Sequence, residues 1–91
     1  MLMLKILIVE DDEKLSQLYK IVLNKAGYET VLASNGQEAW DIFDQEHIDL
    51  VITDVMMPVL NGYDLVKILR NENPLIPVLM ITAKDDYPSK S

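Results

Sequence analysis

Oxygen-bearing side chains follow three short apolar runs of this sequence. Such runs are typical of buried strands, and the carboxyl ends of parallel strands meet at one edge of a sheet. Carboxylates gathered at such an edge can hold a hard divalent cation and act on a phosphoryl group. The residues in question are Glu10, Asp11 and Asp12 after residues 6–9, Asp54 after residues 50–53, and Thr82 after residues 78–81.

The first group is a run of three carboxylates, Glu10, Asp11 and Asp12. Adjacent carboxylates repel one another unless a cation or solvent relieves the repulsion. Taken alone, this run is open to two interpretations. It can be a solvated loop in which Asp12 caps a helix, or a Mg²⁺ site in which one or two carboxylates are ligands.

Asp54 is the second candidate, either as a cap or as a nucleophile. A carboxylate group on a neighbouring strand weakens the capping interpretation, because a carboxylate beside Mg²⁺ stays ionised and can attack phosphorus to form an aspartyl phosphate. Thr82 can be a residue at the edge of the core or a hydroxyl donor to a phosphoryl oxygen. His47 is the only histidine, and we expect it at the surface.

Strands and helices alternate in the segments that must position these side chains. Apolar runs predict the strands, and apolar residues at helical spacing predict the helices. The alternation predicts an α/β fold with a parallel sheet and helices on both faces. The strands are expected at residues 4–9, 28–33, 50–53 and 78–81, and the helices at residues 13–26, after Ser34 and at residues 63–71.

The ends of two helices have recognisable sequence signals. Asp12 is expected to cap the first helix, and Gly27 to stop it. Ser34 and Gln37 match the capping-box pattern at the start of the second helix.

Composition narrows the possible functions. The 91 residues predict one domain, and a net charge of -7 argues against binding to nucleic acid or an anionic membrane. The sequence has no cysteine, and no apolar run approaches the roughly 20 residues that span a bilayer. A reducing cytoplasm is therefore the expected location. A nucleotide-binding Rossmann module is disfavoured because no glycine-rich turn follows the first strand.

Four motifs stand out along the chain. They are Lys-Ile-Leu-Ile-Val-Glu-Asp-Asp at 5–12, Asp-Leu-Val-Ile-Thr-Asp-Val-Met-Met-Pro at 49–58, Asn-Gly at 61–62 and Pro-Val-Leu-Met-Ile-Thr-Ala-Lys at 77–84. Together, in this order and spacing over residues 4–84, they resemble the receiver domain of two-component response regulators. The resemblance implies a flavodoxin-like, three-layer fold with strand order 2-1-3-4, without the fifth strand and fifth helix of the family.

The resemblance also assigns roles to individual residues. It implies that Glu10 and Asp11 bind Mg²⁺, with Asp11 as the direct ligand. Asp54 would be both a metal ligand and the acceptor of the phosphoryl group, and the backbone carbonyl of Met56 would be a further metal ligand. Thr82 would be the hydroxyl that switches the domain between its two states.

The implied function is signalling. A sensor histidine kinase would supply the phosphoryl group, and the modified domain would control a separate effector, expected to be a DNA-binding domain of the winged-helix transcription regulators of bacteria. The domain would not be an enzyme, beyond removing its own phosphoryl group. Residues 1–91 are expected to be a receiver domain that is incomplete at its C-terminus, and the edge of the strand at 78–81 is then expected to pair with a second copy.

Two alternatives are weighed against this interpretation. An aspartyl-phosphate phosphohydrolase of a related α/β fold would need a second aspartate two positions after the nucleophile, and Met56 is at that position. A binding module that works without phosphate would not need Glu10, Asp11, Asp54 and Thr82 together.

Overall fold

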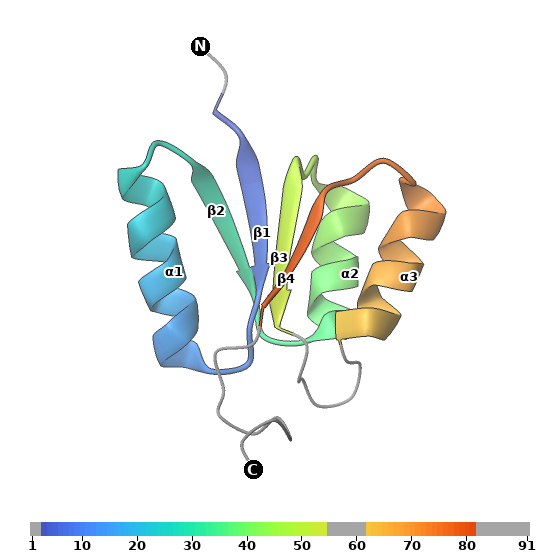
Figure 1. Ribbon diagram of the computed structural model, residues 1–91, viewed down its shortest axis with the longest axis horizontal. Helices are drawn as coiled ribbons and strands as arrows, with labels where there is room; N and C mark the ends of the chain where they lie inside the picture. The colour runs from blue at the N-terminus through green and yellow to red at the C-terminus, as the bar shows by residue number, and fades with distance from the viewer. Residues whose placement is uncertain (1–2, 55–61, 82–91) are drawn as a thin grey trace.

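The computed structural model describes residues 3–54 and 62–81, which form a parallel sheet with helices on both of its faces (Figure 1). The strand boundaries agree with the sequence prediction to within one residue, and β3 extends one residue further to include Asp54. The elements in chain order are β1 (Lys5–Val9), α1 (Glu13–Lys25), β2 (Glu29–Ala33), α2 (Gly36–Gln45), β3 (Leu50–Asp54), α3 (Gly62–Glu72) and β4 (Val78–Ile81).

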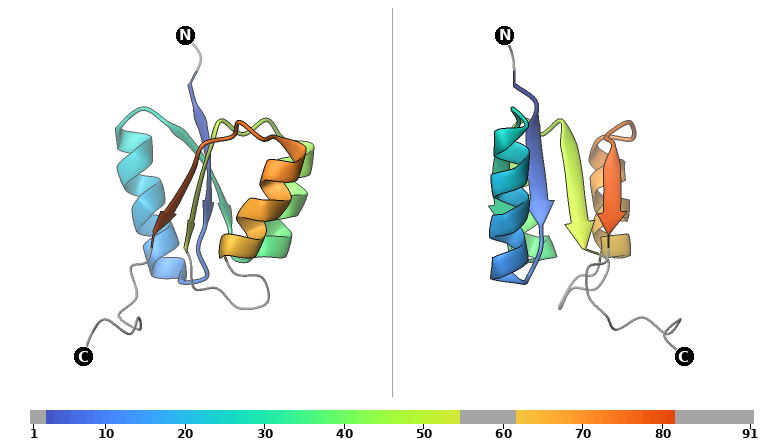
Figure 2. Two further views of the ribbon diagram at one scale, coloured as in Figure 1. Left: turned by 45° about the vertical axis from the view of Figure 1, so that its right-hand side comes forward. Right: turned by 60° about the vertical axis from the view of Figure 1, so that its left-hand side comes forward.

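The strand order is β2-β1-β3-β4, and every neighbouring pair is parallel. Helix α1 covers one face of the sheet, whereas α2 and α3 lie side by side on the other (Figures 1 and 2). The predicted three-layer architecture and strand order are therefore confirmed. All carboxyl ends of the strands point to the same edge, where the candidate site lies.

The main core lies between the sheet and the pair α2 and α3. Leu7 and Val51 from the sheet belong to one hydrophobic cluster with Ala39 of α2 and Leu65 and Leu69 of α3, and each of these side chains is fully buried. The rings of Trp40 and Phe43 stack with centroids 6.4 Å apart and pack against this cluster. Removal of these apolar side chains from water stabilises the packing of the two central strands, β1 and β3, which carry the candidate site.

The opposite face is less completely covered. Helix α1 packs over β1 and β2 and leaves an apolar groove of about 360 Å³ beside β3 and β4. Consequently Leu18 and Val22, which belong to the apolar stripe of α1, remain 52% and 55% exposed. One helix is about 10–12 Å wide and cannot cover four strands spaced about 4.8 Å apart. The groove is lined by Leu18, Tyr19, Val22, Leu23, Ile52, Leu79 and Ile81.

The predicted cap of α1 is confirmed. Oδ1 of Asp12 accepts hydrogen bonds from the backbone N–H groups of Lys14, at 3.0 Å, and Leu15, at 3.3 Å. The helix ends with Ala26 as its C-cap, and Gly27 follows with a φ of 99°. That left-handed conformation favours glycine, so Gly27 stops the helix as expected.

The predicted cap of α2 was wrong by one residue. Asn35, not Ser34, is the N-cap, and its Oδ1 accepts a 2.8 Å hydrogen bond from the N–H of Glu38. Oε1 of Glu38 in turn accepts from the backbone N–H of Ser34, at 2.6 Å. The pattern Asn35 to Glu38 competes with Ser34 to Gln37 and prevails because a charged acceptor makes the stronger hydrogen bond and suits the positive end of a helix.

Within residues 3–54 and 62–81, no helix combines the length and apolar character that a membrane span would require.

Candidate metal site

The site is built by the register of the two central strands. Val9 of β1 pairs with Thr53 of β3, so the next residue on each strand, Glu10 and Asp54, emerges at the same level of the sheet edge. Asp54 also pairs with Ile81 of β4, which places it between β1 and β4. The carboxylates of Glu10 and Asp54 are thus neighbours, although α1, β2 and α2 lie between them in the sequence.

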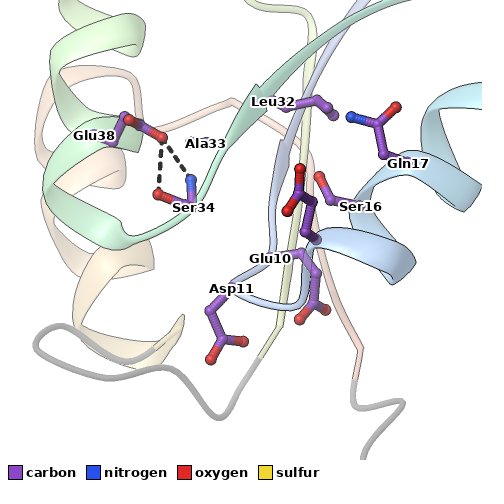
Figure 3. A pocket seen from close by; sticks show the side chains of 9 residues that line it. Glu10, Asp11, Ser16, Gln17, Leu32, Ala33, Ser34 and Glu38 are labelled. Carbon is purple, nitrogen blue, oxygen red and sulfur yellow. Dashed lines mark hydrogen bonds between the residues drawn. The ribbon is translucent and has the colours of Figure 1, made fainter.

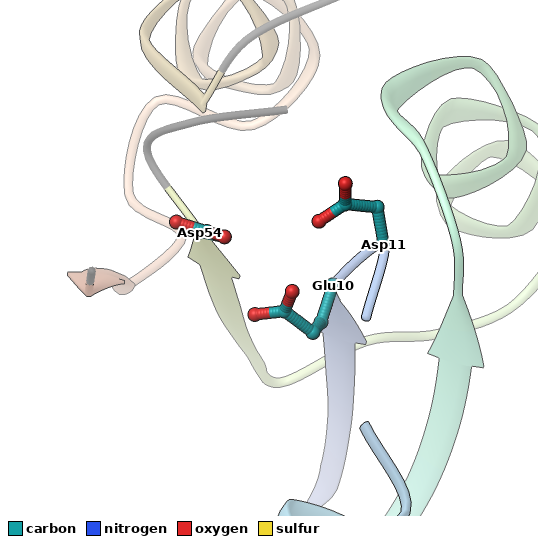
Figure 4. A group of neighbouring side chains, drawn as sticks. All are labelled: Glu10, Asp11 and Asp54. Carbon is teal, nitrogen blue, oxygen red and sulfur yellow. The ribbon is translucent and has the colours of Figure 1, made fainter. Parts of the chain in front are cut away.

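Glu10, Asp11 and Asp54 bring their carboxylates together (Figure 4). Each offers one oxygen, and these three oxygens lie within 4.8 Å of one another. Opposite ligands of one Mg²⁺ are about 4.2 Å apart, because each bond is about 2.1 Å long. The cluster is therefore close to the size of a Mg²⁺ site.

The burial of the three side chains differs. Glu10 is 2% exposed and Asp54 is 1% exposed, whereas Asp11 lies at the surface. Three negative charges at this separation repel one another, and partial burial strengthens the repulsion because less water screens it. A divalent cation bound among them would relieve that repulsion. The donor set is made of carboxylate oxygens, which are the ligands that Mg²⁺ prefers.

Asp12 has a different structural role from Glu10 and Asp11, which precede it. Its side chain caps α1, and it does not belong to the metal-sized group found among the described residues. Of the two interpretations that the sequence left open for the acidic run, capping holds for Asp12 and a metal-sized cluster for Glu10 and Asp11. The backbone N–H of Asp12 donates a 2.9 Å hydrogen bond to Oε2 of Glu10.

Sequence reasoning did not single out Thr53. This residue is fully buried directly before Asp54, and its Oγ1 hydroxyl donates a 3.1 Å hydrogen bond to the backbone carbonyl of Asp54. The contact helps to fix the backbone that carries the Asp54 carboxylate. The only signal in the sequence is a hydroxyl residue inside an apolar run, which by itself does not distinguish this role from ordinary packing.

A cavity of about 340 Å³ adjoins the carboxylate group between the starts of α1 and α2 (Figure 3). Its lining carries four carboxylates, and this charge favours a cationic over an anionic occupant. Glu38 faces this cavity while it accepts from the N–H and hydroxyl of Ser34. The cavity is lined by Glu10, Asp11, Glu13, Ser16, Gln17, Leu32, Ala33, Ser34 and Glu38.

Two predicted site residues, Met56 and Thr82, lie outside the described residues, and their roles remain predictions. His47 is on the surface, as expected, with its side chain 84% exposed. Its Nε2 lies 2.7 Å from Oδ1 of Asp49, and both residues precede the start of β3, whereas Asp54 is at its end.

The chain is similar to curated transcriptional regulators. It is 42% identical over 82 residues to the alkaline phosphatase synthesis transcriptional regulatory protein PhoP of Bacillus subtilis, which covers 90% of this chain and 34% of PhoP. It is 45% identical over 86 residues to the probable transcriptional regulator ycf27 of Cyanophora paradoxa, covering 94% of this chain and 36% of ycf27. The chain thus spans about a third of the length of these relatives.

Solved structures show the same architecture. The chemotaxis protein CheY4 of Vibrio cholerae superimposes with a TM-score of 0.88 at 35% identity, over 98% of this chain and 75% of that one. The response regulator TrrA of Thermotoga maritima was solved in complex with Mg²⁺ and BeF. It superimposes with a TM-score of 0.87 at 34% identity, and the match covers 97% of this chain and 76% of TrrA.

The family model of the response regulator receiver domain matches residues 6–91, which is nearly all of the chain. This match, the strand order and the carboxylate group at the edge of the sheet agree. The chain belongs to the family of response regulator receiver domains.

Proposed function

We propose that this domain accepts a phosphoryl group on Asp54 in a reaction that depends on Mg²⁺. The observation that carries the proposal is the position of Asp54, a buried carboxylate whose oxygen lies within 4.8 Å of carboxylate oxygens of Glu10 and Asp11. The TrrA structure supports it, because that similar receiver was solved with Mg²⁺ and BeF.

In the proposed step, a carboxylate oxygen of Asp54 forms a bond to the phosphorus of a donor. The bond between that phosphorus and the donor breaks, and the donor keeps the electron pair. Bound Mg²⁺ would neutralise the charge on the transferring phosphoryl oxygens. Asp11 would hold the metal directly, with Glu10 beside it, and Thr53 would keep the Asp54 backbone in place. The Met56 carbonyl and the Thr82 hydroxyl complete the proposed site.

The proposed donor is the phosphohistidine of a sensor kinase, and the proposed output is transcription. Support comes from the curated relatives, which are transcriptional regulators about three times as long as the matched segment. We propose that the segment controls a winged-helix DNA-binding domain in the bacterial cytoplasm. The domain would be a switch rather than an enzyme, with loss of its own phosphoryl group as its only turnover.

We also propose that a second copy of the 91-residue chain pairs along β4. Within the described residues β4 has a strand neighbour only on its β3 side, and Leu79 and Met80 are 52% and 37% exposed. An open strand edge with apolar side chains favours pairing with another chain, and two copies of β4 can pair symmetrically about a two-fold axis.

Phosphorylation with a small donor tests the central proposal. The chain is incubated with acetyl phosphate and Mg²⁺, the adduct is trapped by borohydride reduction, and the modified residue is mapped by mass spectrometry. We expect the label on Asp54, and none in Asp54→Asn, while the exposed Asp44→Asn is labelled like the wild type. A label on another residue contradicts the assignment. Mg²⁺ binding without any label would instead favour a binding module that works without phosphate.

A further inference from the structure

We propose that Glu10 is a positioning residue, which fixes the metal ligand Asp11 through a hydrogen bond to the next peptide group. The inference rests on the proposed function, because it concerns the Mg²⁺ site of the same reaction. It starts from one contact, the 2.9 Å hydrogen bond from the backbone N–H of Asp12 to Oε2 of Glu10.

The contact closes a ring around Asp11. The side chain of Glu10 reaches forward past Asp11 to the N–H of Asp12, so the backbone of Asp11 lies inside a loop closed by this bond. Asp11 itself is exposed, so burial does not fix the position of its side chain. Its carboxylate nevertheless meets that of the buried Asp54, which requires a fixed backbone.

Both ends of this ring are attached to the rest of the fold. On one side, the N–H of Glu10 donates a 3.0 Å hydrogen bond to the carbonyl of Ala33 at the end of β2. On the other side, the carbonyl of Asp12 accepts a 2.9 Å hydrogen bond from the N–H of Ser16, inside the first turn of α1. Hydrogen bonds therefore attach the residues on either side of Asp11 to β2 and to α1, and the Glu10 carboxylate connects these two residues to each other.

The burial of Glu10 makes this link strong. Its side chain is 2% exposed, and a hydrogen bond shielded from water is stronger than an exposed one. The bond uses Oε2, and the carboxylate still contributes an oxygen to the metal-sized group. Glu10 thus has three properties: its charge, its ability to accept the Asp12 N–H, and an oxygen that lies in the metal-sized group.

A matched pair of variants removes the charge in both and the side-chain oxygen in only one. Glu10→Gln and Glu10→Met are both neutral and similar in length, but only glutamine keeps an oxygen that can accept from Asp12 or reach the metal. The readout is the Mg²⁺ concentration that gives half-maximal labelling of Asp54 by acetyl phosphate. We expect this concentration to be about 10–100 times higher in Glu10→Met than in Glu10→Gln, as for other residues that orient a metal ligand.

Controls distinguish positioning from other effects. Glu13 lines the same cavity, and Glu13→Gln and Glu13→Met are expected to give equal half-maximal concentrations. The maximal labelling rate at saturating Mg²⁺ should differ little between the two Glu10 variants, because the nucleophile is intact. Equal half-maximal concentrations in the two Glu10 variants overturn the inference and leave the proposed function standing. No labelling of the wild type at any Mg²⁺ concentration overturns both.

Amide hydrogen exchange tests the bond even if Glu10→Met does not fold. In the folded wild type and in Glu10→Gln, the Asp12 amide should exchange slowly without any metal, and in folded Glu10→Met it should exchange faster. Because no metal is present, this difference reports the hydrogen bond and not the loss of a ligand oxygen. Free exchange of that amide in the folded wild type would show that the ring does not form, and would overturn the inference.

Discussion

Asp11 and Asp54 lie on different segments, one in the loop after β1 and the other at the end of β3, yet they offer carboxylate oxygens within 4.8 Å of each other. Only the parallel register of the two strands makes this possible. Folding therefore brings like charges together, and the fold without a cation bears the cost of their repulsion. This relationship gives a stability test that does not depend on phosphorylation.

Replacing Asp54 with asparagine should stabilise the metal-free domain and remove its response to Mg²⁺. The substitution removes one of three clustered charges while it preserves the size of a buried side chain, so we expect a gain of about 1 kcal/mol in the free energy of unfolding. In the wild type, Mg²⁺ at about 100 times its dissociation constant should add about 2.7 kcal/mol. Thermal melts with and without Mg²⁺ measure both effects.

Asp44→Asn is the matched control for this experiment, because Asp44 is an exposed carboxylate on α2, away from the site. It should change neither the stability nor the Mg²⁺ response by more than about 0.5 kcal/mol. If Asp54→Asn still shows the wild-type response to Mg²⁺, the metal does not bind where the carboxylates meet.

Acid should lower the free energy of unfolding of the domain partly through protonation of Asp49. The backbone N–H of Lys5 donates a 2.8 Å hydrogen bond to Oδ2 of Asp49, and this bond, with a smaller effect of His47, holds the pKa of Asp49 below its usual value of 3.8. A carboxyl group with a lowered pKa stabilises the fold above its unfolded pKa and loses that contribution as pH falls through the folded pKa. Below pH 3.8 the free energy of unfolding should therefore fall less steeply in Asp49→Asn than in the wild type.

Urea unfolding between about pH 6 and pH 2 measures this difference, with Asp44→Asn as the control for general loss of a carboxylate. Identical slopes for Asp49→Asn and the wild type would show that the Lys5 and His47 contacts do not bias the protonation of Asp49.

Much of the fold could be predicted from local patterns. The run at residues 6–9 is buried on both faces, and residues 50–53 alternate between partly and fully buried, so both runs are strongly apolar and predict strands. The alternation with helices then fixes a parallel sheet, and a parallel sheet puts Glu10, Asp11 and Asp54 at one edge. The cluster was thus predictable because it depends on strand direction, which the pattern of elements determines.

Other features depend on competition between neighbours or on coverage by distant segments, which local patterns do not report. Ser34 and Asn35 are both good caps, and the choice between them rests on which partner three residues later is charged. The exposure of Leu18 depends on how much of the sheet α1 covers, and that is a tertiary property. The bond from Asp12 to Glu10 needs side-chain geometry, which the sequence does not contain.

The observed cap of α2 predicts a clear order among three substitutions. Asn35→Ala removes the acceptor of the Glu38 N–H and should cost about 1 kcal/mol of stability. Ser34→Ala keeps the backbone N–H that donates to Glu38, so its cost should be smaller. Gln37→Ala should cost least, because the side chain makes only an exposed contact with Asp41. Urea denaturation measures all three, and a larger cost for Ser34→Ala than for Asn35→Ala would restore the cap that the sequence pattern first suggested.

Association along β4 should depend on the apolar side chains at that edge. Leu79 is 52% exposed and lines the apolar groove between α1 and the sheet, so pairing of two copies would bring two Leu79 side chains to the same side of a joined sheet. Leu79→Lys places two like charges there, and lysine is a residue that protects strand edges from pairing.

We expect the wild-type chain to form a dimer in sedimentation equilibrium, and Leu79→Lys to be monomeric at the same concentration. The control is Lys20→Leu on α1, which changes charge outside β4 and outside the residues that line the groove, and it should leave the dimer intact. Fast amide exchange at residues 78–81 in the monomeric variant and slow exchange in the dimer would locate the interface, whereas a wild-type chain that stays monomeric at high concentration would show that the edge does not pair.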